Sequence, residues 1–152
     1  MLKINYSNIE TVFGEPGEPA KKNFITMDTP FPLRYGDTEL HKVTGHKYII
    51  PTFITVLQEI KNIFGLAYIQ EHHLNVFNGC YCFRKIKGDG DWYSVHSWGL
   101  AIDYCANLSP FNAPARTPYH IVQAFKNAGF NWGGDWNNMC DGMHFSPINE
   151  GQ

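Results

Sequence analysis

The sequence predicts one α+β domain that has a small, mainly antiparallel sheet and flanking helices. Helix-like and strand-like stretches occur in groups rather than in strict alternation. No glycine-rich phosphate loop follows a predicted strand. The 152 residues, of which 43% are hydrophobic and 15% aromatic, suffice for one packed core. We therefore take residues 1–152 as a single domain.

Two segments have the apolar spacing of amphipathic helices, and a shorter helix is predicted near the N-terminus. Residues 51–64 place apolar side chains three or four positions apart, and Gly65 ends the segment. The second helix is predicted over residues 118–128, with Thr117 as its N-cap. The short helix covers residues 9–13.

Strand patterns and turn residues occupy other regions. We expect strands, in chain order, at residues 66–69, 81–86, 100–104 and 143–145. Residues 14–35 are rich in proline and glycine. We therefore expect residues 1–40 to form an irregular segment that wraps around the domain.

The charge pattern gives no reason to expect nucleic acid or an anionic membrane as a partner. The formal net charge is −2 at pH 7, and no run of basic residues stands out. The N-terminus lacks the apolar run of a signal peptide, and no apolar stretch is long enough to span a bilayer. We expect a monomer that is made in the cytoplasm and depends on another factor for export.

The cysteine pattern favours free thiols. Cys80 and Cys82 are too close in sequence to bridge easily, and their spacing is not that of a structural zinc site. Buried thiols in a reducing compartment are the default interpretation. A disulfide between Cys105 and Cys140 stays open as an alternative, because both flank the candidate metal residues.

Two short stretches carry the candidate chemistry, SVHSWGLAID at residues 94–103 and DGMHF at residues 141–145. The imidazoles of His96 and His144 with the carboxylate of Asp103 suit a zinc ion that keeps a fourth position open for water. The second carboxylate, Asp141, lies three residues before His144 and is placed to handle the proton of that water. The pattern therefore predicts a zinc hydrolase.

Local geometry supports this grouping. A turn at Gly99 leads into a strand on which Ala101 and Asp103 are expected to point to a cleft, while Leu100 and Ile102 point to the opposite face. Gly142 is expected to give the flexibility for a tight approach to the last strand. The remaining histidines have no partner at ligand spacing and are predicted to be ordinary polar residues; they are His41, His46, His72, His73 and His120.

These motifs carry a family resemblance. Residues 79–84 (GCYCFR), 94–103, 132–136 (WGGDW) and 141–145 occur in the order seen in zinc peptidases that cut bacterial cell-wall peptides. The chain resembles the family of D-alanyl-D-alanine carboxypeptidases and phage L-alanyl-D-glutamate endopeptidases, which shares its fold with the hedgehog signalling domain. The resemblance covers roughly residues 45–147, with a family-like start at 12–16.

The resemblance implies roles for individual residues. It implies that His96, Asp103 and His144 hold zinc, that Asp141 is the catalytic acid/base, and that Arg84 faces the substrate. The Arg84 guanidinium would stabilise the oxyanion or grip a substrate carboxylate. Gly142 stands where the family often has proline, and Asp141 where some relatives have glutamate.

Three more side chains are candidates for contact with substrate. Ser94 would orient a ligand or contact the substrate, although a plain turn serine is a nearly equal alternative. Trp98 and Trp136 would wall a peptide groove, against the alternative that large aromatic residues pack in the core.

Three functions are compatible with these residues. The first is an endolysin-type L-alanyl-D-glutamate endopeptidase that cuts the peptidoglycan stem peptide after phage-type release to the cell wall. The second is a D,D- or L,D-carboxypeptidase or dipeptidase that trims stem ends. The third is a hedgehog-like binding module that keeps zinc without turnover; the presence of Asp141 and Arg84 argues against it.

Overall fold

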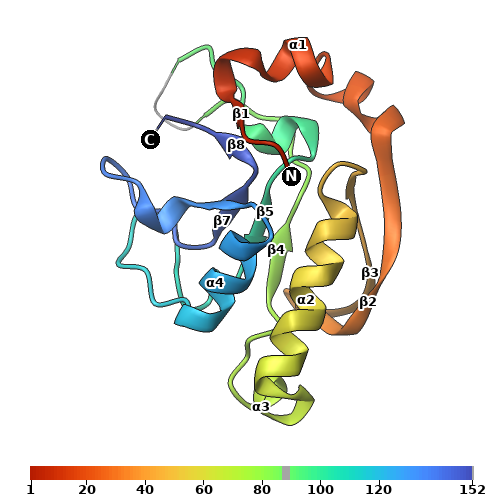
Figure 1. Ribbon diagram of the computed structural model, residues 1–152, viewed down its shortest axis with the longest axis vertical. Coiled ribbons are helices and arrows are strands. Elements are labelled where there is room, and N and C mark those ends of the chain that lie inside the picture. Colours follow the sequence, from red (N-terminus) through yellow and green to blue (C-terminus); the bar gives the residue numbers. More distant parts are fainter. Residues whose placement is uncertain (87–89, 152) are drawn as a thin grey trace.

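The computed structural model describes residues 1–86 and 90–151, and it has the α+β class that the sequence predicts (Figure 1). In chain order the α-helices are α1 (Ile9–Phe13), α2 (Ile50–Phe64), α3 (Leu66–Glu71) and α4 (Tyr119–Asn127). The 3₁₀ helices are η1 (Tyr6–Asn8), η2 (Glu18–Asn23), η3 (Val95–Trp98) and η4 (Gly133–Asp135). The strands are β1 (Ile4–Asn5), β2 (Phe24–Tyr35), β3 (Thr38–His46), β4 (Phe77–Gly79), β5 (Ile102–Tyr104), β6 (Asn131–Trp132), β7 (His144–Ser146) and β8 (Ile148–Asn149).

The strands form a central sheet and two smaller pairs. The central sheet is antiparallel and has the order β4-β5-β7-β6. Strands β2 and β3 form a long antiparallel hairpin, and β1 pairs in parallel with β8, so the two chain ends meet. Figure 1 shows the hairpin along one side of the molecule, and α2 packs against both the hairpin and α4.

The register between β5 and β7 separates the core from the opposite face of the sheet. Ile102 lies opposite Phe145, and Asp103 lies opposite His144. Ile102 and Phe145 are fully buried. Because neighbouring side chains on a strand point to opposite faces, Asp103 and His144 share the other face.

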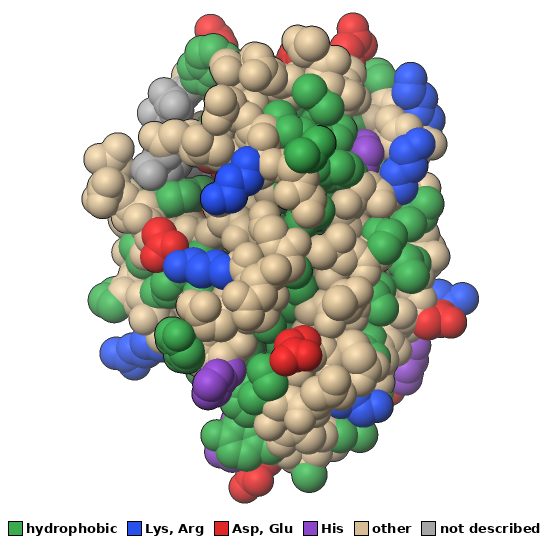
Figure 2. Space-filling model, viewed as in Figure 1, with side chains coloured by type: hydrophobic (Ala, Val, Ile, Leu, Met, Phe, Trp, Pro, Cys, Tyr) green, Lys and Arg blue, Asp and Glu red, His purple; other side chains and the backbone are tan. Residues whose placement is uncertain are grey.

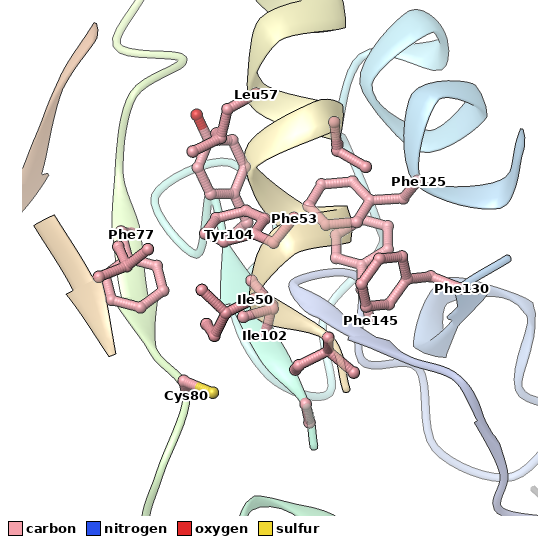
Figure 3. Close-up of a cluster of buried hydrophobic side chains, with 14 of the residues drawn as sticks. Ile50, Phe53, Leu57, Phe77, Cys80, Ile102, Tyr104, Phe125, Phe130 and Phe145 are labelled. Atoms are coloured by element: carbon pink, nitrogen blue, oxygen red, sulfur yellow. The ribbon is translucent and has the colours of Figure 1, made fainter. Parts of the chain in front are cut away.

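An aromatic cluster holds β7 against the helices (Figure 3). The ring of Phe145 stacks on Phe125 of α4 with centroids 3.8 Å apart, and Phe125 in turn lies 5.9 Å from Phe53 of α2. Tyr104 of β5 packs edge-on against Phe53 and donates a 2.6 Å hydrogen bond to the carbonyl of Leu74. Each fully buried phenylalanine contributes about 1.5–3 kcal/mol to stability. The cluster therefore anchors both strands that carry Asp103 and His144.

The helix predictions agree with the structure except for one cap. The helix predicted over residues 51–64 is α2, and the one predicted over 118–128 is α4. Thr117 is not the N-cap of α4. Its hydroxyl instead bonds Ser109 and the carbonyl of Gly142, and Pro118 occupies the cap position without a side-chain bond.

The expectation of an irregular segment over residues 1–40 is wrong from Phe24 onward, where β2 begins. The prolines of β2 lie in the stretch between Asp28 and Leu33 where the pairing with β3 shifts register. Proline is tolerated at such irregularities because the missing N–H is not needed for the ladder. The proline content of this segment therefore led to the prediction of irregular structure where the chain forms a strand.

Two predicted strands are also corrected. Residues 66–69 belong to helix α3, because a run of four apolar residues does not distinguish a strand from a helix. Residues 81–86 contribute one isolated bridge, Lys85 to Tyr93, rather than a strand. In that segment the backbone is bonded instead to the loop that precedes and includes η3.

The cysteines are free thiols, as the spacing predicts, and no disulfide links Cys105 to Cys140. Burial raises the pKa of the Cys80 and Cys105 thiols to about 12, so both are neutral at ordinary pH.

Lysine, arginine and acidic side chains are interspersed on the face shown in Figure 2. Within the described residues, no helix is long and apolar enough to cross a membrane.

Gly99 provides the first test of this architecture. It has φ +67°, and a Cβ at this position would lie 2.7 Å from the Phe24 ring and 3.2 Å from the amide nitrogen of His46. We expect Gly99→Ala to lower the free energy of unfolding by roughly 2–3 kcal/mol, from backbone strain and overpacking together. Urea unfolding of the metal-free protein measures this loss.

Gly36→Ala is the matched control, because Gly36 has φ +57° with nothing within 4 Å of the added Cβ. Strain alone predicts a loss of about 1 kcal/mol there. An equal loss of unfolding free energy in the two variants would contradict the prediction, because it would show that steric contact of the added Cβ with Phe24 and His46 costs nothing.

Candidate metal centre and active site

Three predicted ligands come together on one face of the central sheet. The ligand atoms of His96, Asp103 and His144 all lie within 4.8 Å of one another. His96 Nε2 is 3.2 Å from Asp103 Oδ2, and His144 Nδ1 is 3.5 Å from Asp103 Oδ1. Ligands placed 2.0–2.2 Å from a tetrahedral zinc ion are about 3.3–3.6 Å apart. The two distances to Asp103 fit that spacing.

Backbone contacts orient His96. The Ser94 hydroxyl accepts a hydrogen bond from the His96 amide and caps η3, the turn that carries the imidazole. The ring Nδ1 donates to the carbonyl of Cys80 at 2.7 Å. This bond leaves the Nε2 lone pair for a metal, which is the usual arrangement for a metal-binding histidine.

His144 is held in the reverse orientation. Its Nε2 donates to the carboxylate of Glu150 at 2.7 Å, so Nδ1 faces Asp103. Burial lowers the pKa of His144, but the carboxylates of Glu150 and Asp103 outweigh that effect and hold the pKa well above its usual value. The position therefore attracts a cation, whether a proton or a metal ion.

Asp103 provides the negative charge between the two imidazoles. Burial alone raises the pKa of its carboxyl, but the neighbouring His96 and His144 outweigh burial and the pKa lies below its usual range. Asp103 is therefore a carboxylate at neutral pH, ready to bind a cation.

Unsatisfied buried atoms mark the same place. Of the four buried side-chain atoms without a hydrogen-bond partner among the described residues, three belong to this group: His96 Nε2, Asp103 Oδ1 and Asp141 Oδ1; the fourth is His46 Nε2. Buried polar atoms are rarely left unpaired. Two imidazole nitrogens and a carboxylate oxygen are the donor set of a zinc site with an open position. The residues present therefore fit a divalent metal ion.

Asp141 lies beside this group, in the loop before β7. Its amide donates to the carbonyl of Gly133 at 3.0 Å, and its own carbonyl accepts from the His144 amide at 3.1 Å. Burial raises the pKa of the Asp141 carboxyl, and the charges of His144 and Asp103 act in opposite directions on it. A carboxyl with a raised pKa next to a metal site suits a general acid/base.

Small residues make the position of Asp141 possible. A Cβ at Gly133 would lie 2.4 Å from the Asp141 carbonyl oxygen, and one at Gly142 would lie 2.7 Å from Ala115. Gly142 is thus required for space rather than for the flexibility we expected. Trp132 secures the same loop, because its indole N–H donates to the carbonyl of Gly142 at 2.8 Å.

Arg84 is attached through its backbone to the segment that carries His96. Its amide and carbonyl both bond the hydroxyl of Ser97, and its carbonyl also accepts from the amide of Ser94. The guanidinium donates to the carbonyl of Lys85 at 3.4 Å. Its proposed role toward a substrate remains a prediction.

The predicted substrate contacts have different surroundings. Trp98 is 1% exposed and donates its indole N–H to the carbonyl of Gly14, so it is a core residue and not part of a groove wall. Ser94 is buried and acts as the cap of η3. Trp136 is half-buried, and its ring lies 5.0 Å from that of His144, which leaves it as a candidate for substrate contact.

The other histidines lie outside the metal-binding group found among the described residues. His46 is buried, and burial lowers its pKa to about 4, so it is neutral. Glu150 was not among the predicted site residues. Its place beside His144 depends on tertiary structure, and no sequence motif indicates it.

Comparison with known families places these residues in context. The family model described as D-alanyl-D-alanine carboxypeptidase matches residues 87–147, which is less than half of the chain. The matched segment contains His96, Asp103, Asp141 and His144, whereas Arg84 lies outside it. No curated protein and no solved structure matches the chain.

The α+β fold and the His–Asp–His group thus define a candidate metallohydrolase. The family match supports a peptidase and, more narrowly, the zinc-dependent D-alanyl-D-alanine carboxypeptidase family.

Substitution of the ligands tests the site directly. We expect Asp103→Ala and His144→Ala to lower bound zinc well below one ion per chain, because two remaining protein ligands hold zinc poorly. His96→Ala should do the same. Elemental analysis after dialysis measures the zinc content, and His120→Ala, which changes an exposed histidine of α4, is the matched control. Full stoichiometric zinc in Asp103→Ala or His144→Ala would overturn the ligand assignment.

Proposed function

We propose that this protein is a zinc peptidase that hydrolyses peptide bonds in the peptidoglycan stem peptide, as an endolysin-type L-alanyl-D-glutamate endopeptidase. The observation that carries the proposal is the convergence of His96, Asp103 and His144 beside a second acidic residue, Asp141, whose buried Oδ1 has no hydrogen-bond partner among the described residues. The motif resemblance and the family match to residues 87–147 support it. Its place of action would be the cell wall, reached by phage-type release.

The chemistry divides between the metal and the chain. A zinc ion held by His96, Asp103 and His144 would supply a Lewis acid that lowers the pKa of a bound water to about 7. Asp141 accepts the proton of the attacking water and then donates it to the leaving amine. Burial of Asp141 favours its protonated form, which helps the second of these steps.

Other residues of the chain would position the substrate. Arg84 is the candidate to hold a substrate carboxylate or the developing oxyanion, because its guanidinium is always charged and offers paired N–H donors. Trp136 would contact the peptide next to His144, since its ring already lies against that imidazole.

A second candidate is a D-alanyl-D-alanine carboxypeptidase, which the description of the matched family favours. Both candidates need the same metal site and the same acid/base. They differ in whether the groove accepts a continuous stem peptide or only its free end.

Product analysis separates the two candidates. Purified sacculi are digested with the zinc-loaded protein, and the fragments are identified by mass spectrometry. We expect fragments with a free N-terminal D-Glu, because an endopeptidase cuts after L-Ala. Release of D-Ala would support the carboxypeptidase instead, and no product from a zinc-loaded protein would support a non-catalytic binding module.

Asp141 gives the sharpest test of the mechanism. We expect Asp141→Ala and Asp141→Asn to retain zinc but to lose activity by about 10²–10⁴-fold, the usual contribution of a general acid/base. Zinc content and the rate of stem-peptide release are measured on the same samples. Asp135→Asn, which changes an acidic residue paired with Lys126, is the control and should stay active. Zinc loss as great as in His96→Ala would contradict the assigned role.

A further inference from the structure

Glu150 makes a contact with the candidate metal site that neither the sequence motifs nor the matched family segment includes. Its Oε2 lies 2.7 Å from Nε2 of His144, and its side chain is 12% exposed. The matched segment ends at residue 147. Glu150 faces the side of the imidazole away from Asp103, so it bonds the ring without competing for the ligand atom.

The chain ends hold Glu150 in place. It directly follows β8, in which Ile148 pairs with Ile4 and Asn149 pairs with Asn5 of β1. The side chain of Asn149 donates to that of Asn5 at 3.0 Å, and Ile148 is buried. Glu150 therefore has a defined position although it lies near the C-terminus.

Water also reaches Glu150 from one side. It lines a cavity of about 400 Å³ together with Lys3 and Lys126, on the same surface as Trp136. A carboxylate that borders an open, lysine-containing cavity keeps part of its hydration while it bonds the imidazole. Glu150 therefore contacts both the His144 imidazole and this cavity.

We propose that Glu150 is a positioning residue that orients His144 and strengthens it as a metal ligand. The inference rests on the zinc site proposed above. A carboxylate that accepts the Nε2–H of a histidine fixes the tautomer and makes the other nitrogen more basic. His96 differs, because its ring is oriented by the neutral carbonyl of Cys80. Of the two imidazoles, His144 is thus the one that bonds a carboxylate through the nitrogen facing away from Asp103.

Zinc affinity of the full chain tests this role. Competition with a chromophoric chelator gives the zinc Kd of wild type, Glu150→Ala and Glu150→Gln. We expect Glu150→Ala to raise the Kd 10–100-fold, which is the usual effect of losing such a partner. Glu150→Gln keeps an acceptor oxygen without the charge, so its Kd should lie between the other two. Glu59→Ala removes an exposed acidic residue of α2 and is the matched control.

A spectroscopic signature distinguishes positioning from a role in folding alone. The cobalt-loaded Glu150→Ala and Glu150→Gln proteins should show d–d absorption bands shifted from those of wild type, whereas Glu59→Ala should not. If Glu150→Ala does not fold, Glu150→Gln decides the question by the same two measurements.

The outcomes separate this inference from the proposed function. If wild type binds zinc and the folded Glu150 variants have the same zinc Kd and cobalt spectrum as wild type, the role of Glu150 is overturned. The proposed function then still stands. Wild type that binds no zinc overturns both.

Discussion

The antiparallel pairing of β5 with β7 is the constraint on which the candidate site depends. Asp103 lies opposite His144, and the neighbouring pair is Ile102 and Phe145. A slip of one residue would turn the two polar side chains into the core and the two apolar side chains out of it. The stacking of Phe145 on Phe125 and the full burial of Ile102 oppose that slip. Hydrophobic packing on one face therefore sets the distance between two metal-binding groups on the other.

Sequence patterns predict the parts of the fold that depend on local spacing. Helix α2 has an uninterrupted apolar stripe that ends at Gly65, and its predicted range differs from the observed one by a single residue. The hairpin of β2 and β3 was missed because prolines and a register shift between Asp28 and Leu33 break its alternation. The helix α3 was taken for a strand because its apolar run is too short to show a period.

In the candidate site, too, features that depend on local spacing can be predicted from the sequence, whereas features that depend on tertiary structure cannot. The spacing of His96 and Asp103 around the turn at Gly99 predicts that Asp103 faces away from the core, and the structure agrees. The partners of the two imidazoles have no comparable signal. One is the backbone carbonyl of Cys80, which every residue type offers, and the other is Glu150, whose position depends on the pairing of β1 with β8. Trp98 was misassigned because a large aromatic next to a motif packs into the core as readily as it lines a groove.

The charge of the His144 imidazole depends on the two carboxyl groups beside it. Asp103 and Glu150 flank His144, and together they hold its pKa well above the usual value against the opposing effect of burial. In the absence of metal, a proton on His144 therefore balances part of the buried negative charge. A metal ion at Nδ1 must displace that proton, so metal binding and proton release are coupled at this residue. A proton or a metal ion at His144 Nδ1 offsets part of the cost of burying this imidazole next to Asp103.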